Sequence, residues 1–220
     1  MGKLLNIITP LHGQAKRDYL GRMNDDKAHC MQVARQYGKD FWDGEKKYGY
    51  GGYKYDGRWE VVAKELIHQY KLQPDARILD VGSGKGFLLY ELKKLLPKAT
   101  VVGIDISEYA IRQAKEEIKP YLKKIGAQDP YPFADKEFDL VFSSTTLHNL
   151  YVFELKKALR EIERVGKNKY ICVESYRSAR ELFNLQCWAL TCEIYFNPQE
   201  WVWFFEESGY TGDYEFIYFE

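Results

Sequence analysis

Residues 78–86 read Ile78-Leu79-Asp80-Val81-Gly82-Ser83-Gly84-Lys85-Gly86, a short apolar run followed by three closely spaced glycines. The run is typical of a strand, and the glycines permit the tight turn that ends it. Residues 87–96 then carry leucines at helical spacing and stop before Pro97. A strand, a glycine turn and a helix make the first half of a β-α-β unit, so this stretch predicts a parallel sheet.

The same alternation runs through the rest of the chain. Further strands are expected near residues 101–104, 138–143, 170–173, 190–196 and 214–219. Apolar stripes predict helices between them, one capped by Ser107, one starting at Pro198, and one whose inner face carries Leu155, Leu159, Ile162 and Val165. The apolar runs alternate little, as expected of strands covered on both faces. The predicted fold class is α/β, with a doubly wound, Rossmann-like, mostly parallel sheet of about seven strands and helices on both faces.

The charges balance, with 32 Lys plus Arg against 32 Asp plus Glu over 220 residues. A protein that holds nucleic acid usually has a basic excess or a basic face, so we expect no nucleic-acid partner. No stretch of the sequence approaches the roughly 20 apolar residues needed to span a bilayer. The four cysteines lack the spacing of a metal site, so we expect buried, reduced thiols, no metal and a cytoplasmic protein.

The glycine turn fits neither of two common phosphate-binding motifs. A P-loop would need Ser or Thr after Lys85, where Gly86 stands, and a dinucleotide fingerprint would need glycine at Phe87. Asp80 would also repel a pyrophosphate group and favour a cationic ligand without phosphate. Asp105, at the end of the second strand, can accept hydrogen bonds from both hydroxyls of a ribose. S-adenosylmethionine (SAM) has these properties, with an ammonium group, a sulfonium and a free ribose.

Four segments resemble the motifs of a known family. Residues 78–86 and 102–107 resemble the first two motifs of class I SAM-dependent methyltransferases. Residues 132–141 and 147–150 resemble the later motifs of the small ubiquinone-biosynthesis-like branch, also called methyltransferase type 11. The resemblance covers roughly residues 74–175. It implies SAM as the cofactor and S-adenosylhomocysteine (SAH) as the product.

The resemblance also implies roles for individual residues. Gly82 and Gly84 are expected to lie against the methionine part of the cofactor, while Asp105 binds the ribose and Ile106 stacks on adenine. The full expected cofactor-binding set is Tyr53, Arg58, Asp80, Gly82, Ser83, Gly84, Gly86, Phe87, Asp105, Ile106, Ala127, Gln128 and Ser143.

The chain departs from the family at the adenine end. The family often has Gly-Asp-Ala after the third strand, where the Asp accepts a hydrogen bond from the adenine amine. The matching positions here are Gly126-Ala127-Gln128. Because the side chain of Ala127 cannot accept a hydrogen bond, Gln128 or Asp129 is expected to take this role.

Residues 48–57, Tyr-Gly-Tyr-Gly-Gly-Tyr-Lys-Tyr-Asp-Gly, combine four tyrosines with four glycines. Flexible linkers favour Ser and Pro over Tyr, so we interpret this segment as an ordered lid that closes over the cofactor. We expect Tyr53 to contact the cofactor and Arg58 to pair with its methionine carboxylate. The predicted organisation is an N-terminal extension and lid over residues 1–57, then a SAM-binding methyltransferase domain over residues 58–220.

Methyl transfer needs aligned partners and, for some acceptors, a base. His148 and Glu174, which follow the fourth and fifth strands, are the expected catalytic residues. A histidine titrates near pH 6.5 and could take a proton, but a structural hydrogen bond at a helix start would explain His148 equally. Glu174 directly follows an apolar strand, where a carboxylate is either functional or paired with Arg or Lys.

Together these features predict a methyltransferase that acts on a small-molecule acceptor, more at oxygen than at nitrogen or carbon. The chain lacks the Asn/Asp-Pro-Pro-Tyr/Phe motif of enzymes that methylate nucleobase or glutamine amino groups, and the Pro-Cys nucleophile of cytosine C5 chemistry. One alternative is a SAM-binding module or partner subunit without its own activity, suggested by Trp203, which falls off the apolar stripe of its helix. A nicotinamide oxidoreductase is disfavoured by Asp80. The sequence leaves a homo-oligomer open.

Overall fold

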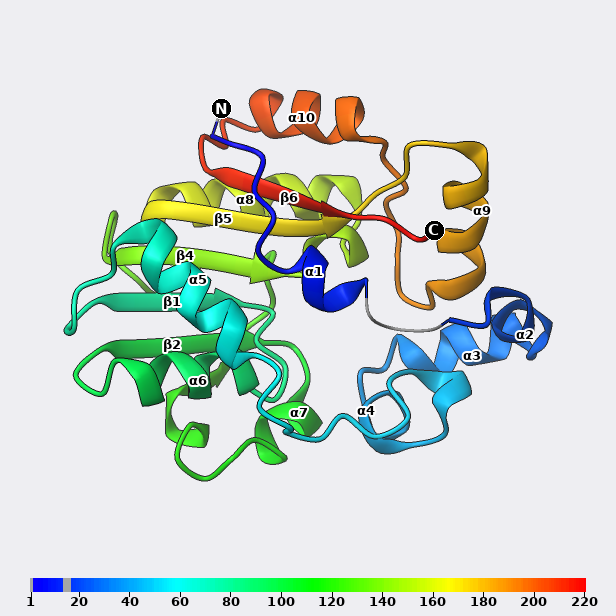
Figure 1. Cartoon of the computed structure of the whole chain (residues 1–220), viewed down its shortest axis with the longest axis horizontal. Coiled ribbons are helices and arrows are strands. Elements are labelled where there is room, and N and C mark those ends of the chain that lie inside the picture. Colours follow the sequence, from blue (N-terminus) through cyan, green and yellow to red (C-terminus); the bar gives the residue numbers. More distant parts are fainter. Residues whose placement is uncertain (1, 14–16) are drawn as a thin grey trace.

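A parallel sheet forms the centre of the computed structural model, which describes residues 2–13 and 17–220. All strand pairs are parallel, in the order β3-β2-β1-β4-β5-β6 (Figure 1). The strands are β1 (Arg77–Val81), β2 (Thr100–Asp105), β3 (Leu122–Lys124), β4 (Phe138–Ser144), β5 (Gly166–Glu174) and β6 (Asp213–Ile217). The strand order reverses at β1, which lies between β2 and β4, so a cleft is expected where these strands end.

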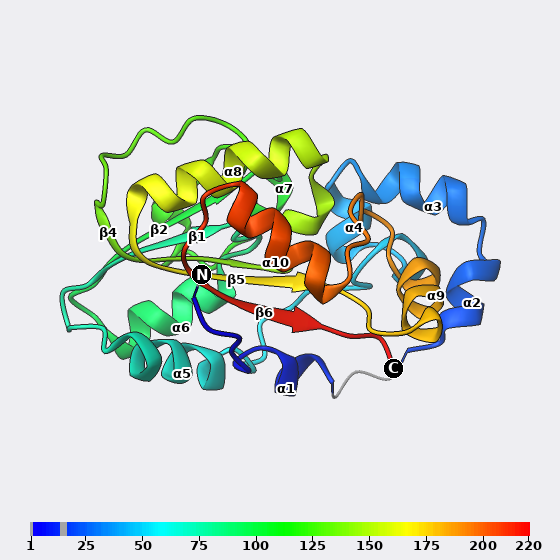
Figure 2. The same cartoon turned by 90° about the horizontal axis from the view of Figure 1, so that it is seen from above.

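Helices cover both faces of the sheet, as predicted (Figure 2). The α-helices are α1 (Thr9–His12), α2 (Tyr19–Asn24), α3 (Lys27–Ala34), α4 (Lys39–Asp43), α5 (Glu60–Tyr70), α6 (Phe87–Leu95), α7 (Glu108–Arg112), α8 (Val152–Val165), α9 (Ala179–Trp188) and α10 (Pro198–Glu207). The 3₁₀ helices are η1 (Lys46–Tyr48), η2 (Lys119–Tyr121) and η3 (Leu147–Asn149). Apolar residues of α5 and α6 pack on one face, and those of α8 and α10 pack on the other. None of these helices is long and apolar enough to cross a membrane.

Several local predictions are confirmed. Ser107 caps α7 by accepting a hydrogen bond from the backbone N–H of Ala110, although α7 is shorter than its apolar stripe suggested. In α10, Trp201 and Phe205 are fully buried, and Trp203 is 59% exposed. All four cysteines are buried and free.

The predicted doubly wound sheet is confirmed, but with six strands in the described chain where about seven were expected, because residues 190–196 form no strand. The backbone N–H groups of Glu193 and Ile194 donate instead to the carbonyl of His148, at 3.0 and 3.1 Å. β5 pairs with β4 on one side and β6 on the other, so this segment cannot pair with it. Beyond β6, the described N-terminal residues contribute only an isolated bridge, between Leu4 and Tyr214.

The extension expected over residues 1–57 has two parts among its described residues. Residues 2–12 lie along β6, where the carboxylate of Glu215 accepts hydrogen bonds from the backbone N–H groups of Ile7 and Ile8 at 2.6 and 2.9 Å. Ile8 is buried against the sheet core. Residues 18–57 form a separate lobe with α2, α3 and α4, beside α9 and near the carboxyl ends of the strands (Figure 1).

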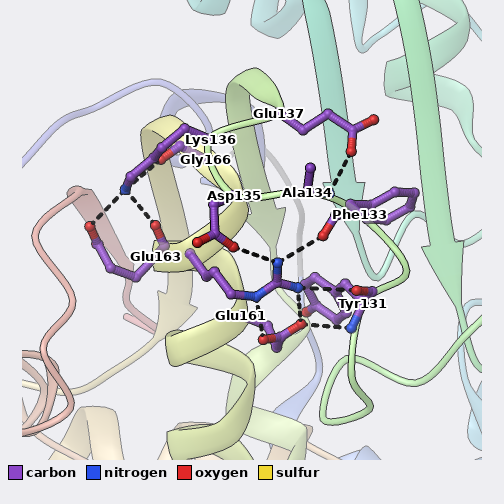
Figure 3. Close-up of polar contacts among 10 residues, drawn as sticks. Tyr131, Phe133, Ala134, Asp135, Lys136, Glu137, Glu161, Glu163 and Gly166 are labelled. Carbon is purple, nitrogen blue, oxygen red and sulfur yellow. Dashed lines mark hydrogen bonds and ion pairs between the residues drawn. The ribbon is translucent and has the colours of Figure 1, made fainter.

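At the opposite edge, where β4 and β5 begin, Arg164 of α8 contacts the loop that precedes β4. Figure 3 labels residues of this loop, among them Tyr131, Phe133 and Asp135. The guanidinium of Arg164 donates to the backbone carbonyls of Tyr131 and Phe133, at 3.1 and 2.7 Å. It also pairs with Glu161 at 2.6 Å and with Asp135 at 2.9 Å. Part of the 132–141 motif therefore serves to anchor this loop to α8.

Candidate functional site

A cavity of about 660 Å³ opens at the carboxyl ends of β1, β2, β4 and β5. Of the expected cofactor-binding residues, all but Gly86 and Ser143 line it, and the expected catalytic residues His148 and Glu174 line it too. The N-terminal lobe supplies a large part of the wall, including Trp42 and Tyr50. The structure therefore brings the sequence-predicted residues to one place.

Gly86 and Ser143 do not line the cavity, and they contact neighbouring parts of the fold instead. The fully buried Ser143 hydroxyl donates to the carbonyl of Val81 at 2.8 Å, which joins β4 to β1. Its neighbour Ser144 lines the cavity, because successive side chains of a strand point to opposite faces. Gly86 precedes α6 with φ +68°, and a Cβ atom there would lie 3.2 Å from the side chain of Leu122.

The turn after β1 needs its glycines for two separate reasons. Gly82 and Gly84 have φ values of +82° and +53°, which side chains with a Cβ rarely adopt. A Cβ on Gly82 would lie 2.1 Å from the Thr146 hydroxyl oxygen, and one on Gly84 would lie 2.7 Å from the ring of Trp42. Bare backbone is therefore required on this side of the cavity.

Two carboxylates lie beside this turn. Asp105 accepts hydrogen bonds from the backbone N–H groups of Gly84 and Ser107, both at 2.7 Å, which hold it at the end of β2. Asp80 is 4% exposed. Burial raises the pKa of both carboxyls, and the neighbouring Asp105 raises that of Asp80 further. In the described chain neither carboxylate pairs with Lys or Arg, so this part of the cavity favours a positively charged ligand.

His148 and Glu174 form a pair on the other side of the cavity. Nε2 of His148 lies 3.4 Å from Oε2 of Glu174, and Nδ1 accepts a hydrogen bond from the backbone N–H of Glu174 at 3.3 Å. Burial lowers the pKa of His148 to about 3 and raises the pKa of Glu174 to about 7. A neutral imidazole whose Nδ1 accepts must carry its proton on Nε2. His148 therefore carries its proton on the nitrogen that faces Glu174, and Glu174 is the group able to take a proton near neutral pH.

Aromatic side chains of the lobe face the glycine turn. The ring of Trp42 stacks on Tyr50 at 5.2 Å between centroids, and Tyr53 stacks on Phe87 of α6 at 5.0 Å. The hydroxyl oxygen of Tyr53 accepts a hydrogen bond from Trp59 at 2.9 Å. Sequence reasoning included Tyr53 but missed Trp42, since a single tryptophan outside any motif carries no local signal.

Arg58 lines the cavity, but its guanidinium pairs with Asp56, Nε lying 2.7 Å from Oδ2. At the adenine end, Ala127 and Gln128 line the cavity. The carboxylate of Asp129 accepts a hydrogen bond from the backbone N–H of Gly126 at 2.9 Å. Gln128 is thus the better placed of the two residues expected to replace the missing acid.

Comparison with known proteins agrees with this geometry. Residues 72–209, more than half of the chain, match the family model described as a methyltransferase domain. The chain belongs to the class I SAM-dependent methyltransferases.

Relatives of this methyltransferase carry varied names. It is 37% identical over 105 residues to the malonyl-[acyl-carrier protein] O-methyltransferase of Legionella pneumophila, covering 46% of this chain and 36% of that one. It is 31% identical over 136 residues to the mitochondrial arginine-hydroxylase NDUFAF5 of Mus musculus, covering 61% and 39%. The chain thus spans about two fifths or less of the length of these two curated relatives.

A solved structure shares the fold over most of the chain. It belongs to the Haloferax volcanii complex between the Trm112 methyltransferase activator and a methyltransferase, with a TM-score of 0.55 and 17% identity. The alignment covers 89% of this chain and 77% of that one.

The residues of the cavity fit the cofactor that the family implies. The carboxylates of Asp80 and Asp105 suit its positive charges and ribose hydroxyls, and the bare turn at Gly82 and Gly84 leaves room for close approach. The buried hydroxyl of Ser83, in the same turn, has no hydrogen-bond partner in the described chain. A polar ligand would satisfy such a group.

Proposed function

We propose that this methyltransferase uses SAM to methylate a small-molecule acceptor at oxygen. The observation that carries the proposal is Glu174, a largely buried carboxyl in the wall of the cavity, 14% exposed, whose pKa desolvation raises to about 7. A hydroxyl acceptor must lose a proton during transfer, and a base with a pKa near the working pH removes it best. An acceptor that is already a free amine would not require such a base.

Bound SAM would supply a methyl group activated by its sulfonium. The residues of this chain would then hold the acceptor oxygen in line with that methyl group and keep water out. Glu174 would take the proton of the acceptor hydroxyl. His148 would donate its Nε2–H to the same carboxylate, because its Nδ1 is occupied by the backbone N–H of Glu174. His148 thus acts as a positioning residue in this scheme.

The first experiment is a thermal melt with and without SAH, with NADH as the control. A ligand at a hundred times its Kd adds about 2.7 kcal/mol, which corresponds to about 5–10 °C for a chain of this size. A shift with SAH alone is expected. A cooperative melt that SAH leaves unchanged would contradict the proposal.

The second experiment follows turnover. The protein is incubated with SAM and pooled small-molecule fractions, and acceptors are found as masses that gain one CH₂ group. With an acceptor in hand, Glu174→Gln should lower the turnover rate by about 10² or more, while SAH affinity stays unchanged. Full activity of Glu174→Gln would remove Glu174 as the base. SAH binding without any methylated product would instead favour the second candidate, a binding subunit, for which the exposed Trp203 offers a surface.

A further inference from the structure

Lys85, in the middle of the glycine turn, is an unexpected residue for a site that favours cations. Its side chain is only 5% exposed. It stands between Gly84, which lines the cavity, and Gly86 at the start of α6. An uncompensated ammonium group in this turn would repel a positively charged cofactor.

The charge of Lys85 is compensated by the N-terminal lobe. Its Nζ lies 2.7 Å from each carboxylate oxygen of Asp43, at the end of α4, and 2.8 Å from the carbonyl of Tyr53. All three N–H donors of the Lys85 ammonium group therefore have an acceptor in the lobe, and the group points toward the lobe.

Asp43 is itself held in place by several groups. It accepts hydrogen bonds from the Tyr109 hydroxyl at 2.9 Å and from the backbone N–H of Tyr53 at 3.1 Å. Burial alone would raise the pKa of Asp43, but the hydrogen bonds from Lys85 and Tyr109 lower it, so the group is a carboxylate at neutral pH. The neighbouring Trp42 donates to the hydroxyl of Ser107 at 2.9 Å, which ties α4 to the turn after β2.

We propose that Asp43 is a positioning residue for the cofactor. It neutralises the charge of Lys85, and it holds the tyrosine- and glycine-rich segment 48–57 against the glycine turn through Tyr53. This inference rests on the proposed function, because it needs SAM to be the ligand. The N-terminal lobe would then help to form the cofactor site, because Asp43 of the lobe and Lys85 of the turn form one largely buried ion pair.

The proposal predicts a difference between two ligands. SAM carries a sulfonium charge that SAH lacks, so an uncompensated charge on Lys85 should weaken the binding of SAM more than the binding of SAH. Calorimetric Kd values are measured for both ligands with wild type, Asp43→Asn, Lys85→Met and the double variant. Asp43→Asn, which keeps the shape of the side chain, should raise the Kd of SAM about tenfold and that of SAH about threefold. Lys85→Met leaves the Asp43 carboxylate uncompensated, so it should lower the ratio of the Kd of SAM to the Kd of SAH, and the double variant should restore the wild-type ratio.

Glu45→Gln is the matched control, because Glu45 lies two residues away, is exposed and pairs only with the surface residue Lys47 among described residues. It should leave both Kd values unchanged. If Lys85→Met does not melt cooperatively, Lys85→Gln replaces it in the cycle.

Equal losses for SAM and SAH in Asp43→Asn would overturn the inference, since they would show only a structural role for Asp43. A lower melting temperature with unchanged Kd values would overturn it as well. Wild-type protein that binds neither ligand would overturn the proposed function itself, and this inference with it.

Discussion

Carboxylates have opposite surroundings at the two edges of the sheet, the one where the strands begin and the one where they end. At the edge where β4 and β5 begin, Glu161 pairs with Arg164, and the hydrogen bond from Arg164 lowers the pKa of Glu161. At the edge where the strands end, Asp80, Asp105 and Glu174 form no ion pair with a Lys or Arg of the described chain. Burial raises their pKa values, and the charge of Arg17 offsets only part of this rise for Glu174. The same residue types therefore serve two purposes in one fold.

The difference separates stability from function. Paired charges at the first edge anchor loops, and a fully satisfied group has no capacity left for a ligand. Desolvated carboxylates without an ion-pair partner at the second edge cost folding free energy, and a cationic ligand or a transferred proton can offset that cost. Mutations at the first edge should therefore change stability, and mutations at the second edge should change ligand binding.

The pH dependence of stability should reveal the cost of Glu174. Its folded pKa of about 7 lies above the ordinary value of 4.5, so the folded state binds the extra proton between these values. The contribution of Glu174 to stability is full below pH 4.5 and is lost as pH rises through 7, by about 3 kcal/mol. Glu174→Gln lacks this term, so its stability relative to wild type should increase over that range. Parallel pH profiles in urea unfolding would contradict the shifted pKa.

Asp105→Asn should strongly weaken binding of the cofactor. It removes the charge that accepts hydrogen bonds from the ribose, so we expect the Kd of SAH to rise about a hundredfold, or about 2.7 kcal/mol. Asp139→Asn at the opposite edge, where Asp139 pairs with Lys167 at 2.8 Å, is the matched control and should leave the Kd unchanged. Equal effects of both variants on the Kd would contradict the claim that only the edge where the strands end contributes to cofactor binding.

Arg164→Met tests the opposite edge. The change removes hydrogen bonds to two backbone carbonyls and ion pairs to Glu161 and Asp135. We expect the free energy of unfolding to fall by about 2 kcal/mol, with the Kd of SAH unchanged. A large loss of SAH affinity in a folded variant would show that the two edges are coupled.

The smallest expected effect is at Arg58, which is half-exposed and already pairs with Asp56. If Arg58 exchanges this partner for the methionine carboxylate, Arg58→Ala should raise the Kd of SAM about fivefold, or about 1 kcal/mol. Asp56→Asn, which frees Arg58, should leave the affinity equal or tighter. An unchanged Kd in Arg58→Ala would remove Arg58 from the cofactor site.

Some expectations failed because they depended on pairing between distant segments. Residues 190–196 have an apolar pattern suited to a strand, but β6 already pairs with β5. Ser143 was expected at the cofactor and Ser144 was not, although only Ser144 lines the cavity. A shift of one residue along a strand reverses the face of the sheet, and the sequence alone carries no marker of that register.

The sequence by itself determined the β-α-β order, the glycine turn after β1 and the acid at the end of β2, because these features depend on residues close together in the chain. Only the tertiary structure decided that Asp43 meets Lys85, 42 residues away, and that Glu174 meets His148, 26 residues away. Such contacts arise from how helices and loops pack over the sheet. Burial in that packing, together with the hydrogen bonds formed in it, shifts the pKa of each group at the site away from the value that its residue type alone would give.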